Sequence, residues 1–508
     1  MKDLDALRAA DLDWVRHLDS VWNDYAYDVA GLHQEVREAF KEKVILYVAG
    51  EDHYSPLGWV IEGAAGSGKT HLAGVFRKLA TDMGANFVLV DMTDVHDFWE
   101  TVLQGFWSSL QQPFEGGKLQ SELVLEALLR KTGVKKNKVR KIADLSPAKR
   151  EQITLQVLNQ IIKNFPQEGP LNQDVIRALI LLNSNDLAQK NVGFCWLQGL
   201  SIEDADKAAY KFLKTQAKPM DVVRGLSWVM SLRGLTVLVF DQLDAIVNQH
   251  HLLAQGAESG TASEAQRTSK AIIEGLAGGL LAVHDLMSKS LNIVSCLQWT
   301  WGILKNEVLS PAAARYEPPR HLDLIGEAGL ARQLIADRLG PANEQVGFET
   351  PYPTYPFSEL FFEQAGSLSP RELLMRCNDH RRACLRAGKV TEIGRIDLVE
   401  PMPPSPGASL DALTADFEKL RAKVAPDELV QEEAEDGLLE SLLRSACYCL
   451  IRENDLPRNV DALLDVDFPG GRVRPLHARI RLVFRDENDR EEHCCLRTIE
   501  RKNAVAFQ

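Results

Sequence analysis

Hydrophobic positions along the chain follow two spacings. Uninterrupted apolar runs bounded by glycine or charged residues are typical of parallel strands that are buried on both faces. Such runs lie at residues 59–61, 87–91, 235–241 and 291–297. Elsewhere apolar residues recur at helical spacing among charges, as in residues 32–46 and 70–79. Strands that alternate with helices predict an α/β fold built around a parallel sheet.

The predicted strands divide the chain into a core and an insertion. We assign residues 1–109 and 221–325 to a core that carries the strands. Residues 110–220 are mostly polar and helical in pattern, so we expect them to form an inserted helical subdomain. Within the core, the small and polar residues 254–269 predict a loop.

Helical patterns continue beyond the core and predict a small helical lid at residues 326–398. Ser369 is the expected N-cap of its last helix, and Pro370 stands at the first helical position. The helical patterns of the lid lie at residues 326–339, 357–365 and 370–387.

The rest of the chain predicts a linker and a small C-terminal region. Residues 399–409 are rich in proline, which is typical of a linker. Residues 410–508 combine an acidic helical stretch with a hairpin pattern at 476–497 that turns at 486–489, which predicts an α+β region. The last apolar residues, 504–508, carry no helix stop signal, so we expect the sequence to be incomplete at this end.

Composition narrows the class of protein. A chain of 508 residues with 45% hydrophobic content predicts two to four globular domains. The net charge of −13 argues against a protein that coats nucleic acid, although it leaves room for a local basic patch. The eight cysteines have no CxxC spacing, and no signal peptide or apolar span is present in the pattern. We therefore expect a cytoplasmic protein with no membrane segment.

A glycine-rich loop carries the strongest chemical signal. It matches GxxxxGK followed by Ser or Thr, between a predicted strand and a predicted helix. Glycines allow successive backbone N–H groups to surround phosphates, Lys69 can reach the β- and γ-phosphate oxygens, and Thr70 can ligate Mg²⁺. We predict that this loop and the adjacent His71 bind ATP. The loop residues are Gly63, Ala64, Ala65, Gly66, Ser67, Gly68, Lys69 and Thr70.

A strand end supplies the second part of the predicted site. Asp241 ends an apolar strand, at the edge of the sheet where nucleotide sites of α/β proteins occur, so we predict that it joins Thr70 in holding Mg²⁺. The next residue is Gln242, whose neutral amide cannot accept a proton from the attacking water. Gln242 could still orient that water, and Asp244 is a candidate substitute acid. The sequence therefore predicts slow ATP hydrolysis.

The order of these motifs resembles that of AAA+ ATPases. The resemblance covers roughly residues 20–390 and is closest to the origin-recognition and STAND branches and to the ATPases of bacterial phage-exclusion (BREX-type) systems. It implies a P-loop NTPase with ATP and Mg²⁺ that assembles as a homo-oligomer or with partner defence proteins. Besides the glycine loop, its motifs are Phe240-Asp241-Gln242-Leu243-Asp244, Cys296-Leu297-Gln298-Trp299, Ala314-Arg315-Tyr316 and Ser369-Pro370-Arg371-Glu372-Leu373.

The resemblance implies roles for residues outside the loop. Gln298, with Ser295 as an alternative, would be the polar sensor of the γ-phosphate. Arg315 would be the arginine finger that completes a neighbouring subunit's site, and Arg371 the second sensor on the lid. Val29 would contact the adenine. The competing interpretation gives these residues structural roles only. Gln298 would be a strand-end side chain, Arg315 a surface arginine, Arg371 a member of an ion pair at a helix start, and Val29 a core residue.

A basic segment in the insertion leaves DNA open as a partner. It runs from Arg130 to Arg150, and the alternative is a solvated helix pair. The preferred function is an ATPase that couples nucleotide state to a partner or DNA, with anti-phage defence as the context that the resemblance implies. The alternatives are a non-hydrolysing signalling scaffold and a DNA-loading or DNA-remodelling ATPase. The predicted DNA contacts are Lys135, Lys136, Lys138 and Arg140.

Overall fold

The computed structural model divides the chain into two compact units, Met1–Met402 and Pro403–Gln508. Each unit is described by itself. The structure describes residues 2–13, 18–23, 28–49, 55–93, 95, 97–134, 142–254, 264–307, 315–363, 365–395, 446, 460–464, 478–484 and 491–496.

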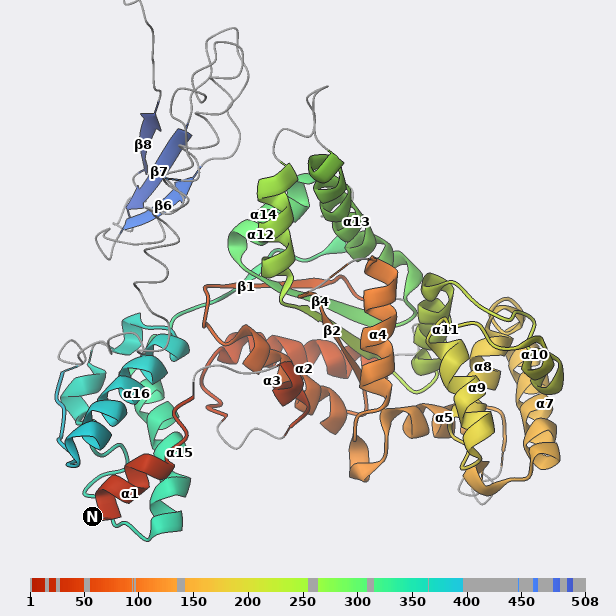
Figure 1. The fold of residues 1–508 in the computed structure, drawn as a ribbon, viewed down its shortest axis with the longest axis horizontal. Helices are drawn as coiled ribbons and strands as arrows, with labels where there is room; N and C mark the ends of the chain where they lie inside the picture. Colours follow the sequence, from red (N-terminus) through yellow and green to blue (C-terminus); the bar gives the residue numbers. More distant parts are fainter. Residues whose placement is uncertain are drawn as a thin grey trace, which may run out of the picture. The chain divides into compact units, whose positions relative to one another are not determined.

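A five-stranded parallel sheet forms the centre of the first unit (Figure 1). Its strands are hydrogen-bonded in the order β2-β3-β4-β1-β5, with parallel register between every neighbouring pair. The strand β4 therefore separates the glycine-loop strand β1 from the strand β3 that ends at Asp241. The predicted α/β fold class is confirmed. The strands are β1 (Trp59–Gly63), β2 (Asn86–Asp91), β3 (Thr236–Asp241), β4 (Ser290–Cys296) and β5 (Arg320–Leu322).

Both faces of the sheet are covered, which explains why its strands are continuously apolar. Alternate residues of β3 belong to different hydrophobic clusters: Val237 and Val239 to one, Leu238 and Phe240 to the other. The first cluster includes Phe40 and other residues of α2 and α3, and the second is built with α4, α11, α12, α13 and α14. These helices are α2 (Gln34–Ala49), α3 (Lys69–Asp82), α4 (Phe98–Leu110), α11 (Pro219–Ser231), α12 (Leu243–Ala254), α13 (Glu264–Leu286) and α14 (Gln298–Glu307).

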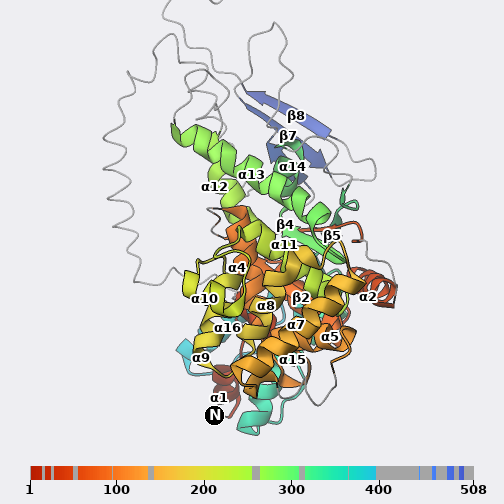
Figure 2. The same cartoon turned by 90° about the vertical axis from the view of Figure 1, so that its right-hand side faces the viewer.

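The predicted insertion, residues 110–220, is helical in its described part, as the pattern indicated. Its helices lie together in Figure 2, and their apolar residues continue the hydrophobic cluster of one sheet face. They are α5 (Gln120–Lys131), α7 (Pro147–Asn164), α8 (Gln173–Leu182), α9 (Leu187–Leu197) and α10 (Asp204–Tyr210). Short 3-10 helices lie in the N-terminal segment at η1 (Leu18–Trp22), in the insertion at η2 (Glu115–Gly117), η3 (Ile142–Asp144) and η4 (Pro170–Asn172), and in the lid at η6 (Glu359–Phe362) and η7 (Ala365–Ser367).

A separate hydrophobic cluster holds the lid helices together with the N-terminal helix. The elements are α1 (Lys2–Ala9), α15 (Ala328–Val346) and α16 (Pro370–Ala387). The predicted start of α16 is confirmed, because the Ser369 hydroxyl accepts the Glu372 N–H at 3.2 Å and the Glu372 carboxylate accepts the Ser369 N–H at 2.8 Å.

Three predicted boundaries were wrong. The pattern at 357–365 forms two 3-10 helices rather than one α-helix, because Phe357, Phe361 and Phe362 reach the same core through tighter turns. Helix α15 continues beyond residue 339 to Val346. Residues 264–269 of the predicted loop belong to α13.

The second unit contains a three-stranded antiparallel sheet in the order β6-β7-β8. The predicted hairpin is confirmed as β7 and β8, and β6 was not predicted. The turn at 486–489, the linker at 399–409 and, apart from Ala446, the helical stretch at 410–452 lie outside the described residues. The strands are β6 (Val460–Leu464), β7 (Ala478–Phe484) and β8 (Glu491–Leu496).

Candidate functional site

The glycine loop connects the end of β1 to the start of α3, as the motif requires. Gly66 and Gly68 have φ values of 85° and 98°, a conformation that favours glycine. A Cβ on Gly63 would lie 2.4 Å from the Ser67 hydroxyl oxygen, so a side chain at this position is also excluded. The loop thus has the tight backbone that brings N–H groups to a bound anion.

Lys69 is folded under its own loop. Its Nζ donates to the carbonyl oxygens of Gly63 at 2.7 Å and Ala64 at 3.3 Å. Burial lowers the pKa of Lys69, and the carboxylates of Asp244 and Asp241 act in the opposite direction. The ammonium group is therefore held beside the loop by two neutral carbonyl oxygens. Phosphate oxygens could replace them, because a charged acceptor binds an ammonium group more strongly than a neutral one.

Thr70 and Asp241 meet across the sheet edge. The Thr70 hydroxyl donates to Oδ2 of Asp241 at 2.7 Å, and Asp241 is only 2% exposed. Burial raises the pKa of Asp241, while the hydrogen bonds from Thr70 and from the Gln242 N–H act to lower it. A hydroxyl and a carboxylate oxygen are ligands that suit Mg²⁺, so this pair fits a magnesium ion shared with phosphates and water.

Gln242 has an unusual backbone. Its φ is 66°, in the left-handed region that few residues other than glycine adopt. Its Oε1 lies 2.6 Å from the Thr93 hydroxyl, which is also 2.5 Å from Oδ1 of Asp91. Because a hydroxyl has one hydrogen, Thr93 can donate to only one of these two oxygens at a time. The Gln242 side chain is therefore held at the end of β2, beside Asp91.

Three candidate site residues near α14, namely Asp244, Gln298 and Ser295, differ in their contacts and in their exposure. Asp244 accepts hydrogen bonds from the Leu297 N–H at 2.7 Å and the Thr300 hydroxyl at 2.6 Å, so it caps α14. Gln298 is the first residue of α14 and is exposed, whereas Ser295 is buried in β4. The sensor role of Gln298 stays a prediction.

Arg371 lies directly against the glycine loop. Its N–H donates to the Gly66 carbonyl at 3.3 Å, and a Cβ on Gly66 would lie 2.4 Å from the Arg371 Cβ. The start of the lid helix α16 thus reaches the loop, and the exposed Arg371 side chain is placed beside it.

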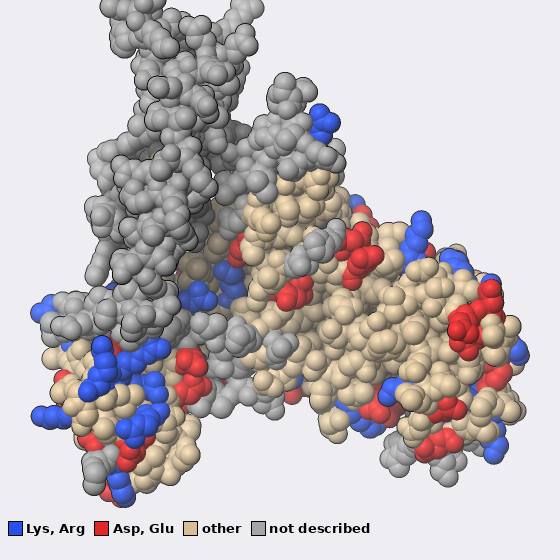
Figure 3. All heavy atoms as spheres, in the orientation of Figure 1, with Lys and Arg blue, Asp and Glu red and all other residues tan. Residues whose placement is uncertain are grey.

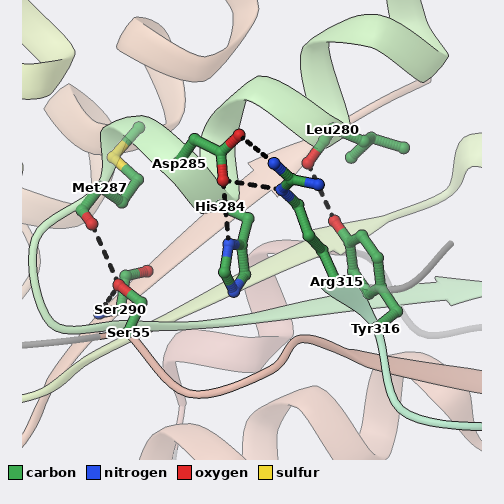
Figure 4. A network of polar contacts seen from close by, with 8 residues as sticks. All are labelled: Ser55, Leu280, His284, Asp285, Met287, Ser290, Arg315 and Tyr316. Atoms are coloured by element: carbon green, nitrogen blue, oxygen red, sulfur yellow. Dashed lines mark hydrogen bonds and ion pairs between the residues drawn. The ribbon is translucent and has the colours of Figure 1, made fainter. Parts of the chain in front are cut away.

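Arg315 lies elsewhere. It precedes Tyr316, which pairs with Gly58 just before β1, so it stands at the amino edge of the sheet, opposite the glycine loop. Its guanidinium forms two hydrogen bonds with Asp285, at 2.7 and 2.8 Å (Figure 4). Arg315 therefore cannot act on the glycine loop of its own chain, and its role toward a neighbouring subunit stays a prediction.

The N-terminal segment adds contacts that sequence reasoning missed. His33 Nε2 lies 2.8 Å from the Ser67 carbonyl oxygen and must donate to it, because a carbonyl only accepts. Asp28 forms hydrogen bonds with Arg37 at 2.7 and 2.9 Å and contacts His71 at 3.0 Å. The hydrogen bonds from His71 and Arg37 outweigh burial and lower the pKa of Asp28. No motif in the sequence signalled these contacts.

Two other predicted residues are also placed. Val29 is 1% exposed within the lid cluster, so its contact with adenine stays a prediction. Arg150, the end of the predicted basic segment, is 2% exposed, which corrects the expectation that it contributes to a basic surface. The predicted DNA contacts Lys135, Lys136, Lys138 and Arg140 lie outside the described residues.

Comparisons with known proteins give little more. No family model and no curated protein matches the chain. Among solved structures it is similar to the ORC2 protein of Aeropyrum pernix, determined as ADPNP–ADP complexes, with 11% identity and a TM-score of 0.36 over 85% of this chain and 78% of that chain. This likeness does not define a family for the chain. Within the described residues, no helix is both long and apolar enough to span a membrane.

Proposed function

We propose that the protein is an ATP-binding ATPase of the AAA+ type that uses Mg²⁺ and hydrolyses ATP slowly. The observation that carries the proposal is the meeting of the glycine loop, Lys69, Thr70 and Asp241 at the carboxyl edge of a parallel sheet. This edge is where open α/β sheets bind their ligands, and the three side chains are those that phosphoryl transfer uses.

Each residue then has a defined task. The loop N–H groups would bind the phosphates, and Lys69 would exchange the carbonyls of Gly63 and Ala64 for phosphate oxygens. Thr70 and Asp241 would hold Mg²⁺, which neutralises phosphate charge when bound. Arg371, beside Gly66, would contact the phosphates from the lid and thereby couple the nucleotide to lid position.

Slow turnover is proposed from the residue that follows Asp241. Gln242 is an amide, and its side chain is held by Thr93 at the end of β2. An amide can orient a water molecule but cannot take its proton. Asp244 is engaged as the cap of α14, which argues against a free catalytic acid at that position.

The substitution Lys69→Ala tests the site. We expect it to abolish ATP binding and turnover, because it removes the ammonium group that faces the β- and γ-phosphates. Lys78→Ala is the matched control, since Lys78 is an exposed lysine on the same helix. Calorimetric ATP titration and phosphate release would measure both variants. Retention of ATP binding by the Lys69→Ala variant would overturn the site assignment.

A second candidate is a nucleotide-dependent switch that does not hydrolyse ATP. The chemistry of Gln242 favours it, because its amide cannot accept a proton from water and its side chain is held by Thr93 at the end of β2. ATP recovered intact from purified protein, with no phosphate released over many hours, would favour the switch. Measurable steady-state turnover would exclude it.

A third candidate is a DNA-dependent ATPase. Lysines and arginines gather over the lid in Figure 3, where α16 carries Arg376, Arg382 and Arg386. DNA binding that weakens steeply with salt would favour this candidate. Partner proteins and a role in anti-phage defence remain predictions of the resemblance alone.

A further inference from the structure

A pocket lies within the helical insertion, and none of the residues that line it belongs to the glycine loop. It has a volume of about 230 Å³, which is smaller than the usual range for drug-sized ligands. Four helices, α7, α8, α9 and α10, contribute its walls. Its lining includes Arg150, Glu151, Thr154, Arg177, Gln189 and Tyr210.

Two buried arginines face this pocket. Arg150 is 2% exposed and Arg177 is 6% exposed, which is unusual because charged side chains are seldom buried without strong partners. Arg150 contacts the Gln189 side chain and donates to the Ala143 carbonyl at 3.0 Å. Burial lowers the pKa of Arg150, a sign that its positive charge is poorly solvated.

The bonding of Arg177 is incomplete. One terminal nitrogen donates to the Tyr210 carbonyl at 3.1 Å and lies 3.4 and 3.5 Å from the two oxygens of Glu151, which is long for a charged pair. Its Nε is buried and has no hydrogen-bond partner among the described residues. A buried donor of this kind indicates a missing acceptor.

The surrounding carboxylates do not supply that acceptor. Glu151 is shared with Lys211 at 3.2 Å. Asp186 accepts the N–H groups of Ala188 and Gln189 as the cap of α9, and Asp144 accepts from the Asn185 amide. Among the residues that line the pocket, the two arginines stand against one carboxylate, that of Glu151, so the charge of the lining favours an anion.

We propose that this pocket binds the oxyanion group of a small molecule, either a phosphate or a carboxylate, between Arg150 and Arg177. The planar guanidinium groups can each donate more than one hydrogen bond to such a group. Gln189, Thr154 and the Tyr210 hydroxyl line the same space and add polar contacts. The site is independent of the proposed ATP site.

Calorimetric titration of the full chain with inorganic phosphate and, separately, with succinate tests the proposal. Both probes are also applied to the Lys69→Ala variant, because phosphate could bind the glycine loop. We expect at least one probe to bind the Lys69→Ala variant. We expect Arg177→Gln to weaken that binding by ~10-fold or more, since it removes a charge-assisted contact. The probe that binds identifies the chemistry as phosphate or carboxylate.

Two further variants keep the test decisive. Arg224→Gln removes the same charge from an exposed arginine of α11 that lies outside the pocket lining, and should change binding by less than ~2-fold. Ala209→Phe places a ring at the pocket from an exposed position, and should block binding even if Arg177→Gln fails to fold. Binding lost in Lys69→Ala but kept in Arg177→Gln or Ala209→Phe would overturn the proposal. The absence of binding by either probe up to about 10 mM would also overturn it.

Discussion

Asp241 meets two opposing requirements at the scale of a single residue. Its carboxylate suits Mg²⁺, but in the folded chain it is buried and its pKa is raised by that burial. A buried acid with a raised pKa loses stability as pH rises from the pKa of the unfolded chain through that of the folded chain. In the proposed site, the buried carboxylate of Asp241 would serve Mg²⁺ binding while it lowers the stability of the nucleotide-free protein.

The substitution Asp241→Asn should separate these effects. Without nucleotide, we expect a melting temperature a few degrees above that of the wild type at pH 7, because the amide carries no buried charge. This difference should shrink toward pH 4, where the wild-type carboxyl becomes protonated. Thermal melts between pH 4 and pH 7 measure this difference in melting temperature. In a separate assay, phosphate release by the variant should fall to background. A variant less stable than the wild type at pH 7 would show that the Thr70 hydrogen bond outweighs the cost of burial.

Gln242 decides the rate in the proposed mechanism. Gln242→Glu would supply a carboxylate that accepts a proton from water, and we expect turnover to rise by ~10- to ~100-fold. The substitution keeps the side-chain length. Because the new glutamate lies near Asp91, repulsion between the two carboxylates should raise the pKa of the glutamate. Steady-state phosphate release is the measurement, with Gln242→Ala as the control that adds no base. Equal rates for the wild type and the Gln242→Glu variant would assign the general base to another group.

At the scale of elements, the sequence predicted what local interactions determine. The strand, glycine loop and start of α3 follow from a short motif, and α16 begins where Ser369 and Glu372 can cap each other. The start of α13 was missed because its first six residues are mostly polar and carry no large apolar side chain, whereas packing of later residues such as Ile273 stabilises the whole helix. Local pattern is therefore sufficient only where a cap or motif fixes the boundary.

The contacts of the glycine loop with distant segments could not be predicted. His33 and Asp28 reach the loop and α3 through tertiary packing, and nothing in their local sequence indicates a hydrogen bond to Ser67 or His71. The burial of Arg150 was hidden for the same reason, because a basic run has the same sequence pattern whether it is solvated or folded inward. Long-range packing decides both cases.

Helix α16 links the loop to the lid. Arg371→Ala should weaken ATP binding by ~5- to ~10-fold, since a guanidinium contact with phosphate contributes about 1 to 1.5 kcal/mol. Arg386→Ala, at the exposed end of the same helix, is the matched control and should have little effect. ATP titration compares them. Equal losses in both variants would indicate a general electrostatic effect of the lid rather than a contact by Arg371.

At the scale of the whole molecule, the position of Arg315 makes assembly testable. It stands at the sheet edge opposite its own glycine loop, where Asp285 holds it in an ion pair. Any catalytic role must therefore act on another copy of the chain, which requires a head-to-tail contact and release of the guanidinium from Asp285.

A mixing experiment decides whether sites are shared between chains. Lys69→Ala and Arg315→Ala should each have low phosphate release alone. In an equal mixture about one quarter of the interfaces would join an intact glycine loop to an intact Arg315, so we expect roughly 25% of wild-type turnover. Size measurement with and without ATP shows whether assembly accompanies the recovery, and Arg224→Ala mixed with Lys69→Ala is the charge-matched control. If Arg315→Ala alone retains full turnover, no trans role exists. If the Arg315→Ala variant is inactive and mixing restores no turnover, Arg315 acts within its own chain. Its role would then be structural: the hydrogen bonds with Asp285 join α13 to the segment before β5.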